Sequence, residues 1–302
     1  MLGPLNKCWH WLPLISLPLV LMTTETSLKC AESPAPAEML LTLRRPLVIA
    51  HRGYSQVAPE NTLPAFKLAK AAGADLVELD YHHTQDGVPV VIHDGELDRT
   101  TDAVAQWGGK NIHVASKTLA ELRTLDAGQW FDAKYAGTRL PTLTKALDLI
   151  QDGNLTLIER KAGEAATCVK LLRDRKLINH VVVQSFDWNY LKDFHQQESR
   201  QILAALGPPG SLGGKKLEAA AKTLDYSWGD EVWRTGARVV VWNRQITRES
   251  VAYAHEQGMK VWVYTIDDPV IANAMLDLGA DGIISNDPPV IQRTCAIRLA
   301  VR

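Results

Sequence analysis

The sequence predicts a TIM-type (β/α)8 barrel with a small insertion after a hairpin that follows the second strand. Two observations predict this fold. From Pro46 onward, eight short β-rich runs alternate with helical patterns, as parallel strands and their crossover helices do. One such barrel needs about 250 residues, and the chain has 302. A doubly wound open sheet is the alternative, but no G-x-G-x-x-G or phosphate-loop motif supports it.

Apolar runs and helical spacings place the elements in order along the chain. The predicted barrel strands are Leu47–Ala50, Leu76–Asp80, Leu155–Glu159, Val181–Gln184, Ile202–Ala205, Arg238–Trp242, Lys260–Tyr264 and Gly282–Ser285. The predicted helices are Leu63–Ala72, Thr142–Ile150, Ala165–Arg175, Trp188–Gln196, Lys215–Thr223, Arg248–Glu256 and Pro269–Leu278. One more strand, Val88–Ile92, follows the hairpin signal Asp86-Gly87. No helical pattern separates it from the second barrel strand, so we interpret it as an excursion from the barrel.

The barrel is predicted over residues 46–290, and the chain around it divides into shorter parts. The polar segment 94–139 has weak periodicity and is predicted as an insertion at the C-terminal face, where catalytic loops of such barrels lie. Residues 38–45 are predicted as a linker and residues 291–302 as a C-terminal tail.

Residues 1–37 are predicted as a signal peptide. Their apolar core, Trp11–Met22, is interrupted by two prolines, and it is shorter than the roughly 20 residues that a spanning helix needs. Ala35-Pro36-Ala37 is a candidate cleavage site. We therefore expect an exported protein, periplasmic or secreted. An uncleaved N-terminal anchor and a mistaken start site are the alternatives.

Charge and cysteine content exclude several classes of protein. A formal net charge of −1 gives no electrostatic footprint for nucleic acid. The four cysteines form no CxxC pair, so neither a zinc site nor a disulfide framework is indicated. A Cys168–Cys295 bridge stays open, and two free thiols are the simpler reading. No obligate protein partner is evident, and the expected partner is a small-molecule substrate.

Three carboxylates lie at the ends of predicted barrel strands. Glu78 and Asp80 are two residues apart in one strand, so their side chains share one face. Glu159 ends another strand in the same way. Burying two carboxylates together costs several kcal/mol unless a cation lies between them. The sequence therefore predicts one divalent cation, Mg²⁺ or Ca²⁺, because both prefer oxygen ligands.

Basic residues accompany these carboxylates and indicate phosphodiester chemistry. His51 ends the first strand and His93 ends the hairpin strand, and histidine exchanges protons near neutral pH. Arg52 is expected to bind a phosphate oxygen. Lys161 is expected to contact the phosphate or to brace the carboxylates, with an exposed loop lysine as the alternative. Three other histidines lack this context and are expected in loops: His82, His83 and His113.

Aromatic residues near the barrel mouth are candidates for the substrate pocket. Trp262 and Tyr264 share one strand face, and Phe186 and Trp242 are expected to join them. Core packing is the alternative for each residue.

An ordered set of motifs then resembles the glycerophosphodiester phosphodiesterase family from about Pro46 to Pro289. The motifs are His51-Arg52-Gly53, Pro59-Glu60-Asn61-Thr62, Glu78-Leu79-Asp80, Thr84–Asp94, Leu97–Thr101, Ala127–Phe131, Leu140–Leu143, Glu159-Arg160-Lys161, Gln184-Ser185-Phe186 and Gly279–Ile284. Each motif alone is nonspecific, and the ordered set is specific. The family usually differs at three places, near Lys145, at Tyr264 and at Ser285-Asn286.

The resemblance implies a TIM-type barrel and a divalent metal held by Glu78, Asp80 and Glu159. It also implies acid–base catalysis by His51 and His93, with glycerophosphodiesters hydrolysed to sn-glycerol 3-phosphate and an alcohol. A lysophospholipase D-type or cyclic-phosphate-forming phosphodiesterase is one alternative function. A catalytically inactive binding protein on the same barrel is the other.

Overall fold

The computed structural model describes residues 36–212, 215–216, 218 and 222–301, besides Met1 and Gly3. From residue 36 onward they form one compact unit. The expected signal peptide lies outside the described residues except at Met1, Gly3 and its last two positions. Among the described residues, no helix is both long and apolar enough to cross a membrane.

Eight parallel strands close into a barrel, which confirms the predicted fold class. In sheet order they are β1 (Leu47–Ala50), β11 (Gly282–Ser285), β10 (Lys260–Val263), β9 (Val239–Trp242), β6 (Ile202–Gly207), β5 (Val181–Ser185), β4 (Leu155–Arg160) and β2 (Leu76–His83). Pairing of β1 with β2 closes the ring. The strand β3 (Pro89–Val91) runs antiparallel to β2, as the hairpin signal predicts.

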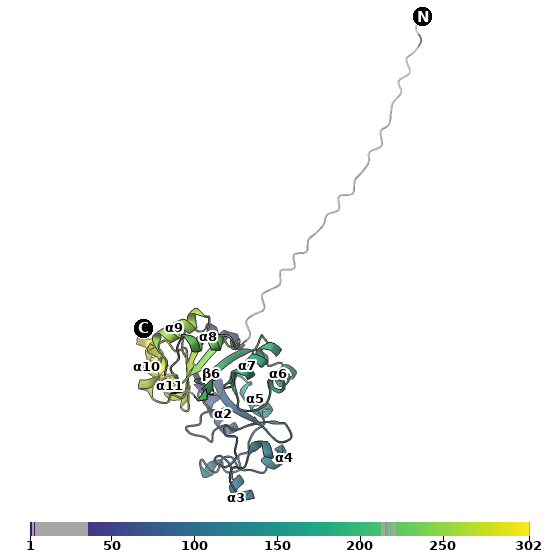
Figure 1. Ribbon diagram of the computed structural model, residues 1–302, viewed down its shortest axis with the longest axis vertical. Helices are drawn as coiled ribbons and strands as arrows, with labels where there is room; N and C mark the ends of the chain where they lie inside the picture. Colours follow the sequence, from purple (N-terminus) through teal and green to yellow (C-terminus); the bar gives the residue numbers. More distant parts are fainter. Residues whose placement is uncertain (2, 4–35, 213–214, 217, 219–221, 302) are drawn as a thin grey trace. The chain divides into compact units, whose positions relative to one another are not determined.

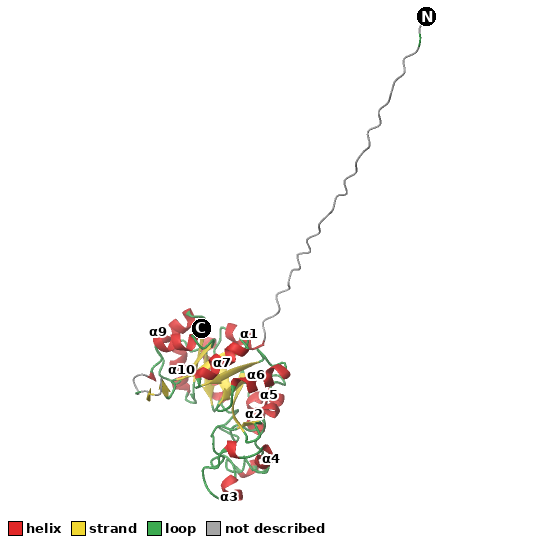
Figure 2. Cartoon of the chain, turned by 45° about the vertical axis from the view of Figure 1, so that its right-hand side comes forward, coloured by secondary structure: helices red, strands yellow, loops and turns green. Residues whose placement is uncertain are grey.

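A helix follows each barrel strand and packs outside the sheet, as Figure 2 shows. These helices are α2 (Leu63–Ala71), α5 (Leu143–Ile150), α6 (Ala165–Asp174), α7 (Trp188–Gln197), α8 (Tyr226–Trp233), α9 (Arg248–Glu256), α10 (Pro269–Asp277) and α11 (Pro288–Val301). One buried cluster fills the space between the strands and the helices, and a second fills the barrel interior. Catalytic loops therefore rise from a rigid, fully packed base.

Three expectations from the sequence are corrected by this structure. The expected linker at 38–45 is mostly helix α1 (Pro36–Thr42), whose Ala37 and Leu41 belong to the barrel-interior cluster. Of the tail expected at 291–302, the described residues 291–301 belong to helix α11, the last barrel helix. Both segments carry enough apolar residues to be buried, which a short sequence window does not reveal.

The third correction concerns the helix expected at Lys215–Thr223. The described residues there include a two-residue strand, β8 (Lys215–Lys216), which pairs with β7 (Ser211–Leu212). The helix of this barrel unit is α8, and it begins at Tyr226, where Asp225 accepts the backbone N–H of Trp228 as an N-cap. Helical spacing in a short polar segment is a weak signal for a helix. The N-cap residue Asp225 lies further along the chain, and helix α8 begins directly after it.

The insertion forms a separate lobe with its own hydrophobic core. It contains α3 (Ala103–Trp107), α4 (Leu119–Leu122) and two 3₁₀ turns, Val114–Ser116 and Ala133–Tyr135. Figure 1 shows α3 and α4 together at one end of the compact unit, away from α6 to α11. Its buried apolar side chains form a cluster distinct from the two barrel clusters, which includes Leu97 and Leu122.

This separation predicts different effects for two matched substitutions of fully buried leucines. Leu172→Ala, in the layer between strands and helices, should lower the free energy of unfolding of the whole protein by about 2–5 kcal/mol. Leu97→Ala should instead open the insertion locally. Hydrogen exchange measures both effects. Equal loss of amide protection throughout the barrel in Leu97→Ala would show that the insertion belongs to the same cooperative unit.

Candidate active site

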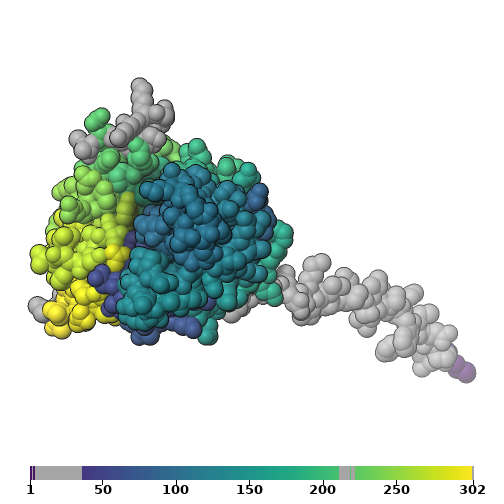
Figure 3. All heavy atoms as spheres, turned by 90° about the horizontal axis from the view of Figure 1, so that it is seen from below, coloured from purple at the N-terminus to yellow at the C-terminus, as the bar shows by residue number. Residues whose placement is uncertain are grey.

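A cavity of about 200 Å³ opens at the C-terminal ends of the barrel strands. It is lined by eight of the residues that the sequence singled out: His51, Arg52, Glu78, His93, Glu159, Lys161, Phe186 and Tyr264. Figure 3 views the molecule from the insertion's end and shows the insertion covering one side of this face, beside the C-terminal half. The barrel therefore brings together residues from segments that lie far apart in the sequence.

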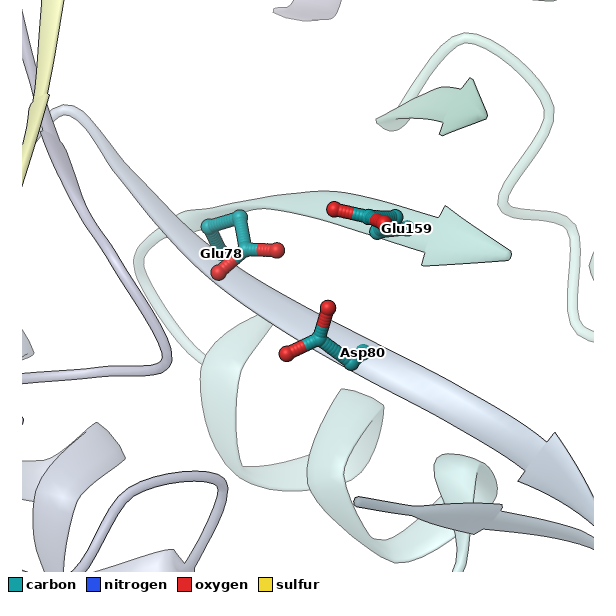
Figure 4. Close-up of side chains that lie close together, drawn as sticks. All are labelled: Glu78, Asp80 and Glu159. Carbon is teal, nitrogen blue, oxygen red and sulfur yellow. The ribbon is translucent and has the colours of Figure 1, made fainter. Parts of the chain in front are cut away.

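The three predicted carboxylates converge on one side of two neighbouring strands. Asp80 on β2 pairs in register with Glu159 on β4, and Glu78 lies two residues earlier on the same face. Ligand oxygen atoms of the three residues all lie within 4.8 Å of one another, and Figure 4 shows the carboxylates turned toward a shared space. All three residues are buried, with at most 6% of the surface exposed.

Crowding and burial shift the pKa values of this cluster strongly. Burial raises the pKa of Glu78 well above its ordinary range, and the charges of Asp80 and Glu159 raise it further. Burial also raises the pKa of Glu159 to about 7, although Lys161 opposes the shift. Burial alone would raise the pKa of Asp80, but the charges of Lys161 and Arg52 outweigh it and lower the pKa. The cluster needs further positive charge to be fully ionised at neutral pH.

The oxygen atoms of the site fit a divalent cation. Gln184 Oε1 is buried and accepts no hydrogen bond from the part of the chain that the structure describes, and the buried oxygens Asp80 Oδ1 and Glu159 Oε1 face the ammonium group of Lys161. Gln184 pairs in register with Glu159, so the three oxygen-bearing residues form one row across β2, β4 and β5. The ammonium group of Lys161 forms ion pairs with Asp80 and Glu159. A row of oxygen atoms that can act as metal ligands suits Mg²⁺ or Ca²⁺.

Arg52 and Gly53 form a tight turn that points a backbone N–H group at the carboxylates. Arg52 has a positive φ of 55°, which is rare outside glycine, and its N–H donates to Glu78 Oε2 at 2.7 Å. Gly53 has a φ of 82°, and a Cβ atom there would lie 2.7 Å from the carbonyl carbon of Ala65. Glycine is therefore required where the turn packs against α2.

His51 holds a neutral imidazole at the edge of the cavity. Its Nδ1 atom lies 2.7 Å from Asn286 Oδ1, and its backbone N–H donates to the carbonyl of Ser285. Burial lowers the pKa of His51 to about 4, and the positive charge of Arg52 adds to this shift. At neutral pH the ring is therefore uncharged and has one nitrogen free to accept a proton.

His93 has a different partner. Its Nδ1 atom donates to Asp94 Oδ1 at 2.6 Å, and Arg99 Nε donates to Asp94 Oδ2 at 2.6 Å. The hydrogen bond from Arg99 has the largest effect on the pKa of Asp94, and the one from His93 adds to it. Together they hold this pKa well below its ordinary range. Burial lowers the pKa of His93, while the charge of Asp80 and the hydrogen bond to Asp94 oppose that shift. An ionised carboxylate beside His93 favours its protonated form.

Glu60 links the two histidine-bearing segments. It accepts hydrogen bonds from Arg52 Nη1 at 2.8 Å and from Arg99 Nη2 at 2.7 Å. Arg99 belongs to the insertion, so the insertion helps to hold both the turn at Arg52 and the carboxylate of Asp94. The chain of contacts runs from one histidine to the other without leaving the mouth of the barrel.

The predicted substrate-binding residues have mixed outcomes. Arg52 and Lys161 line the cavity, as do Tyr264 and Phe186, whose rings meet edge to face with centroids 6.1 Å apart. Trp262 does not line it. Its ring is fully buried in the barrel interior against Gly282. It precedes Tyr264 by two residues, so it shares the inward face but lies roughly 6–7 Å deeper along the strand.

Two lesser expectations also change. Trp242 belongs to the cluster between strands and helices, where its ring packs against Trp228, so it faces away from the barrel interior. His82 and His83 lie at the end of β2 rather than in a loop. His82 Nε2 contacts the carbonyl of His93 at 3.1 Å. The described cysteines, Cys168 and Cys295, are free and buried.

Sequence reasoning missed several polar residues that support the site. Asn61 donates to Asp80 Oδ2 at 2.8 Å and accepts the backbone N–H of Asp80 at 3.1 Å, which fixes that carboxylate. Gln184 and Glu60 were noted only as parts of motifs, and Asn286 only as a position where the family usually differs. Asp94 and Asn286 directly follow a predicted site residue or strand, and this adjacency was the available signal. Asn61 and Glu60 lie in a loop whose path no local pattern predicts.

Comparison with known proteins agrees with this geometry. Residues 51–290 match the model of the glycerophosphoryl diester phosphodiesterase family. A glycerophosphodiester phosphodiesterase of Caldanaerobacter subterraneus is 33% identical over 257 residues, which cover 81% of this chain and 96% of that protein.

Two solved structures share the fold. One is an Oleispira antarctica phosphodiesterase in complex with the product sn-glycerol-3-phosphate, with a TM-score of 0.71, 27% identity and coverage of 83% of this chain and 97% of that chain. The other is a glycerophosphodiester phosphodiesterase from Agrobacterium tumefaciens, with a TM-score of 0.67, 25% identity and coverage of 82% and 99%. The chain described here belongs to the glycerophosphoryl diester phosphodiesterase family.

Proposed function

We propose that this enzyme hydrolyses glycerophosphodiesters to sn-glycerol 3-phosphate and an alcohol, with one divalent cation and two histidines of opposite proton roles. The observation that carries the proposal is the cavity lined by His51, His93, Glu78 and Glu159, with the buried carboxylate of Asp80 grouped with the other two. The Oleispira relative, solved with sn-glycerol-3-phosphate, supports the proposed product.

Glu78, Asp80 and Glu159 are the proposed metal ligands, with Gln184 beside them in the same row. A bound divalent cation would neutralise charge on the phosphate and stabilise the charge that develops during its displacement. Mg²⁺ and Ca²⁺ are both compatible with an all-oxygen set. Arg52 directs its guanidinium toward Asp80 and Glu60, and it is proposed to add a second positive charge at the phosphate.

The two histidines take different roles because their partners differ. His51 is neutral and accepts the proton of the attacking hydroxyl group, from water or from the glycerol 2-hydroxyl. His93, beside the ionised Asp94, donates a proton to the leaving alkoxide. Each transfer can contribute about 10²–10⁴-fold to the rate. Phe186 and Tyr264 provide an apolar wall for the substrate at the mouth.

We also propose that the protein is exported. The apolar core at Trp11–Met22 supports this proposal. Helix α1 supports a signal-peptide cleavage site upstream of Pro36. Ala37 is fully buried, and its N–H donates to the carbonyl of Asn179 at 3.0 Å. Cleavage after Ala37 would remove this contact, so cleavage upstream of Pro36 is favoured.

The first prediction concerns metal and pH. Exhaustive chelation should abolish turnover of glycerophosphodiesters, and Mg²⁺ or Ca²⁺ should restore it. Because the pKa of Glu159 is about 7 in the metal-free site, a cation must displace a proton at lower pH. Metal affinity, measured by calorimetry, should therefore rise from pH 6 to pH 8.

Glu78→Gln and Glu159→Gln should each weaken metal binding, while Glu249→Gln, on the exposed start of α9, serves as the matched control. Full activity after chelation and dialysis, or an affinity that does not change with pH, would contradict the proposed site. If no glycerophosphodiester is hydrolysed when metal is supplied, the alternative of a catalytically inactive binding protein is favoured.

The second prediction concerns the leaving group. His51→Ala and His93→Ala should each lower kcat by ~10²-fold or more on a glycerophosphodiester. A phenolate leaves without a proton, so His93→Ala should lose much less on an aryl phosphodiester. His51→Ala should lose equally on both substrates. His113→Ala is the control, because His113 is exposed in the insertion and its ring lies 3.7 Å from Glu96 Oε1.

Equal losses for both variants on both substrates would refute the role assignment, and the reverse pattern would exchange the roles. Phosphorus NMR of the product separates hydrolysis to sn-glycerol 3-phosphate from release of a cyclic phosphate. The same panel with lysophospholipids tests the lysophospholipase D alternative.

The third prediction concerns the mature N-terminus. Terminal sequencing of the exported protein should place it between Thr24 and Glu38, most consistently before Pro36. Leu17→Arg, within the apolar core, should block export and leave Met1 in place. A wild-type protein that keeps Met1 and remains in the soluble cytoplasmic fraction would contradict export.

A further inference from the structure

The side chain of Asn286 lies between His51 and Asp267. Its Oδ1 atom is 2.7 Å from His51 Nδ1, and its Nδ2 atom donates to Asp267 Oδ2 at 2.8 Å. Asp267 follows β10, Asn286 follows β11 and His51 follows β1, which are three adjacent strands of the barrel. The barrel therefore places an aspartate, an amide and an imidazole in one hydrogen-bonded row.

Asp267 fixes which way the amide of Asn286 faces. Its carboxylate accepts hydrogen bonds from Ser285 Oγ at 2.8 Å and from the backbone N–H of Asn286 at 2.7 Å, both on Oδ1. An ionised carboxylate only accepts hydrogen bonds. A flipped amide would therefore set its carbonyl oxygen against Asp267 Oδ2. The orientation with Nδ2 toward Asp267 avoids this repulsion and turns Oδ1 toward His51.

The orientation of the amide in turn determines the tautomer of His51. An amide oxygen cannot donate, so His51 Nδ1 must carry the hydrogen that joins the two residues. In the neutral ring the other nitrogen, Nε2, is then left with its lone pair. Ser55 Oγ lies 2.9 Å from the same Asn286 oxygen and 2.8 Å from the carbonyl oxygen of His51, and its one hydrogen can be donated to either.

We propose that Asp267 is a positioning residue that acts through Asn286 to keep His51 in the Nδ1–H tautomer, with Nε2 free to accept a proton. The proposal rests on the proposed base role of His51. The amide between Asp267 and His51 also matters, because a carboxylate in direct contact with His51 would favour a protonated imidazole, as the hydrogen bond between His93 and Asp94 does. The amide orients the base without charging it.

The test compares Asp267→Asn with a swapped pair, Asp267→Asn/Asn286→Asp. In Asp267→Asn the new amide has one donor group, and either orientation sets that donor against an N–H group of Asn286 or the hydroxyl group of Ser285. The amide of residue 286 should then flip and reverse the tautomer of His51. We expect kcat to fall ~10-fold or more, with KM nearly unchanged.

In the swapped pair the carboxylate at 286 accepts from His51 Nδ1 and from the amide at 267, so the Nδ1–H tautomer is restored. Most of the lost kcat should return when activity is measured above the pKa of the histidine. Asp268→Asn is the matched control. Asp268 caps α10 through the N–H groups of Val270 and Ile271, and asparagine is an equally good cap.

Nitrogen-15 NMR of His51 reads the tautomer without relying on turnover. Wild type and the swapped pair should show Nδ1 protonated, and Asp267→Asn should show Nε2 protonated. An Nε2–H tautomer in wild type overturns the proposal even if no variant folds. So does an Asp267→Asn variant with wild-type tautomer and kcat, or a swapped pair no better than the single variant.

These experiments distinguish failure of the proposed function from failure of the positioning role of Asp267. If wild type does not turn over glycerophosphodiesters, or His51→Ala stays active, the proposed function is wrong. If wild type is active and His51→Ala is not, while Asp267→Asn keeps full kcat and the same tautomer, only the positioning role of Asp267 is wrong.

Discussion

Three carboxylates buried at the end of a closed barrel are the constraint on which the rest of the site depends. Charges removed from water cost several kcal/mol each unless they are compensated. Glu78, Asp80 and Glu159 receive that compensation from Asn61, from the N–H of Arg52 and from Lys161. Even so, the raised pKa of Glu159 shows that positive charge is still lacking. We propose that a divalent cation supplies this charge.

The same constraint explains why the loops at this face are built so rigidly. The turn at Arg52 adopts a positive φ, a conformation that costs energy and persists only where surrounding contacts enforce it. Glu60 accepts a hydrogen bond from the guanidinium of Arg52, and Arg99 joins Glu60 to Asp94, which is the partner of His93. The insertion is thus part of the support of the site as well as one side of its entrance. His51 is held separately, through an amide, whereas His93 contacts the carboxylate of Asp94, so the two histidines have different hydrogen-bond partners.

Strand positions and strand-end chemistry were predictable, because alternation along a strand decides which side chains face inward. Glu78, Asp80 and Glu159 follow from that rule, and the ordered motifs identified the family. Trp262 shows the limit of the alternation rule. The rule places Trp262 on the same strand face as Tyr264, but it does not say how deep in the barrel each side chain lies. Helix α1 and the end of α11 were missed because burial of their apolar residues depends on the closed barrel. Asp267 was missed because its role exists only through Asn286, a contact between neighbouring loops that no local pattern encodes.

The most direct measurement of the central claim is a crystal structure of the enzyme with Mn²⁺, located by anomalous scattering. We expect one ion bound by oxygen atoms of Glu78, Asp80 and Glu159, at roughly 2.0–2.6 Å. We also expect the ammonium group of Lys161 to have moved away from Asp80 and Glu159. An ion bound elsewhere, with Lys161 still paired to both carboxylates, would contradict it.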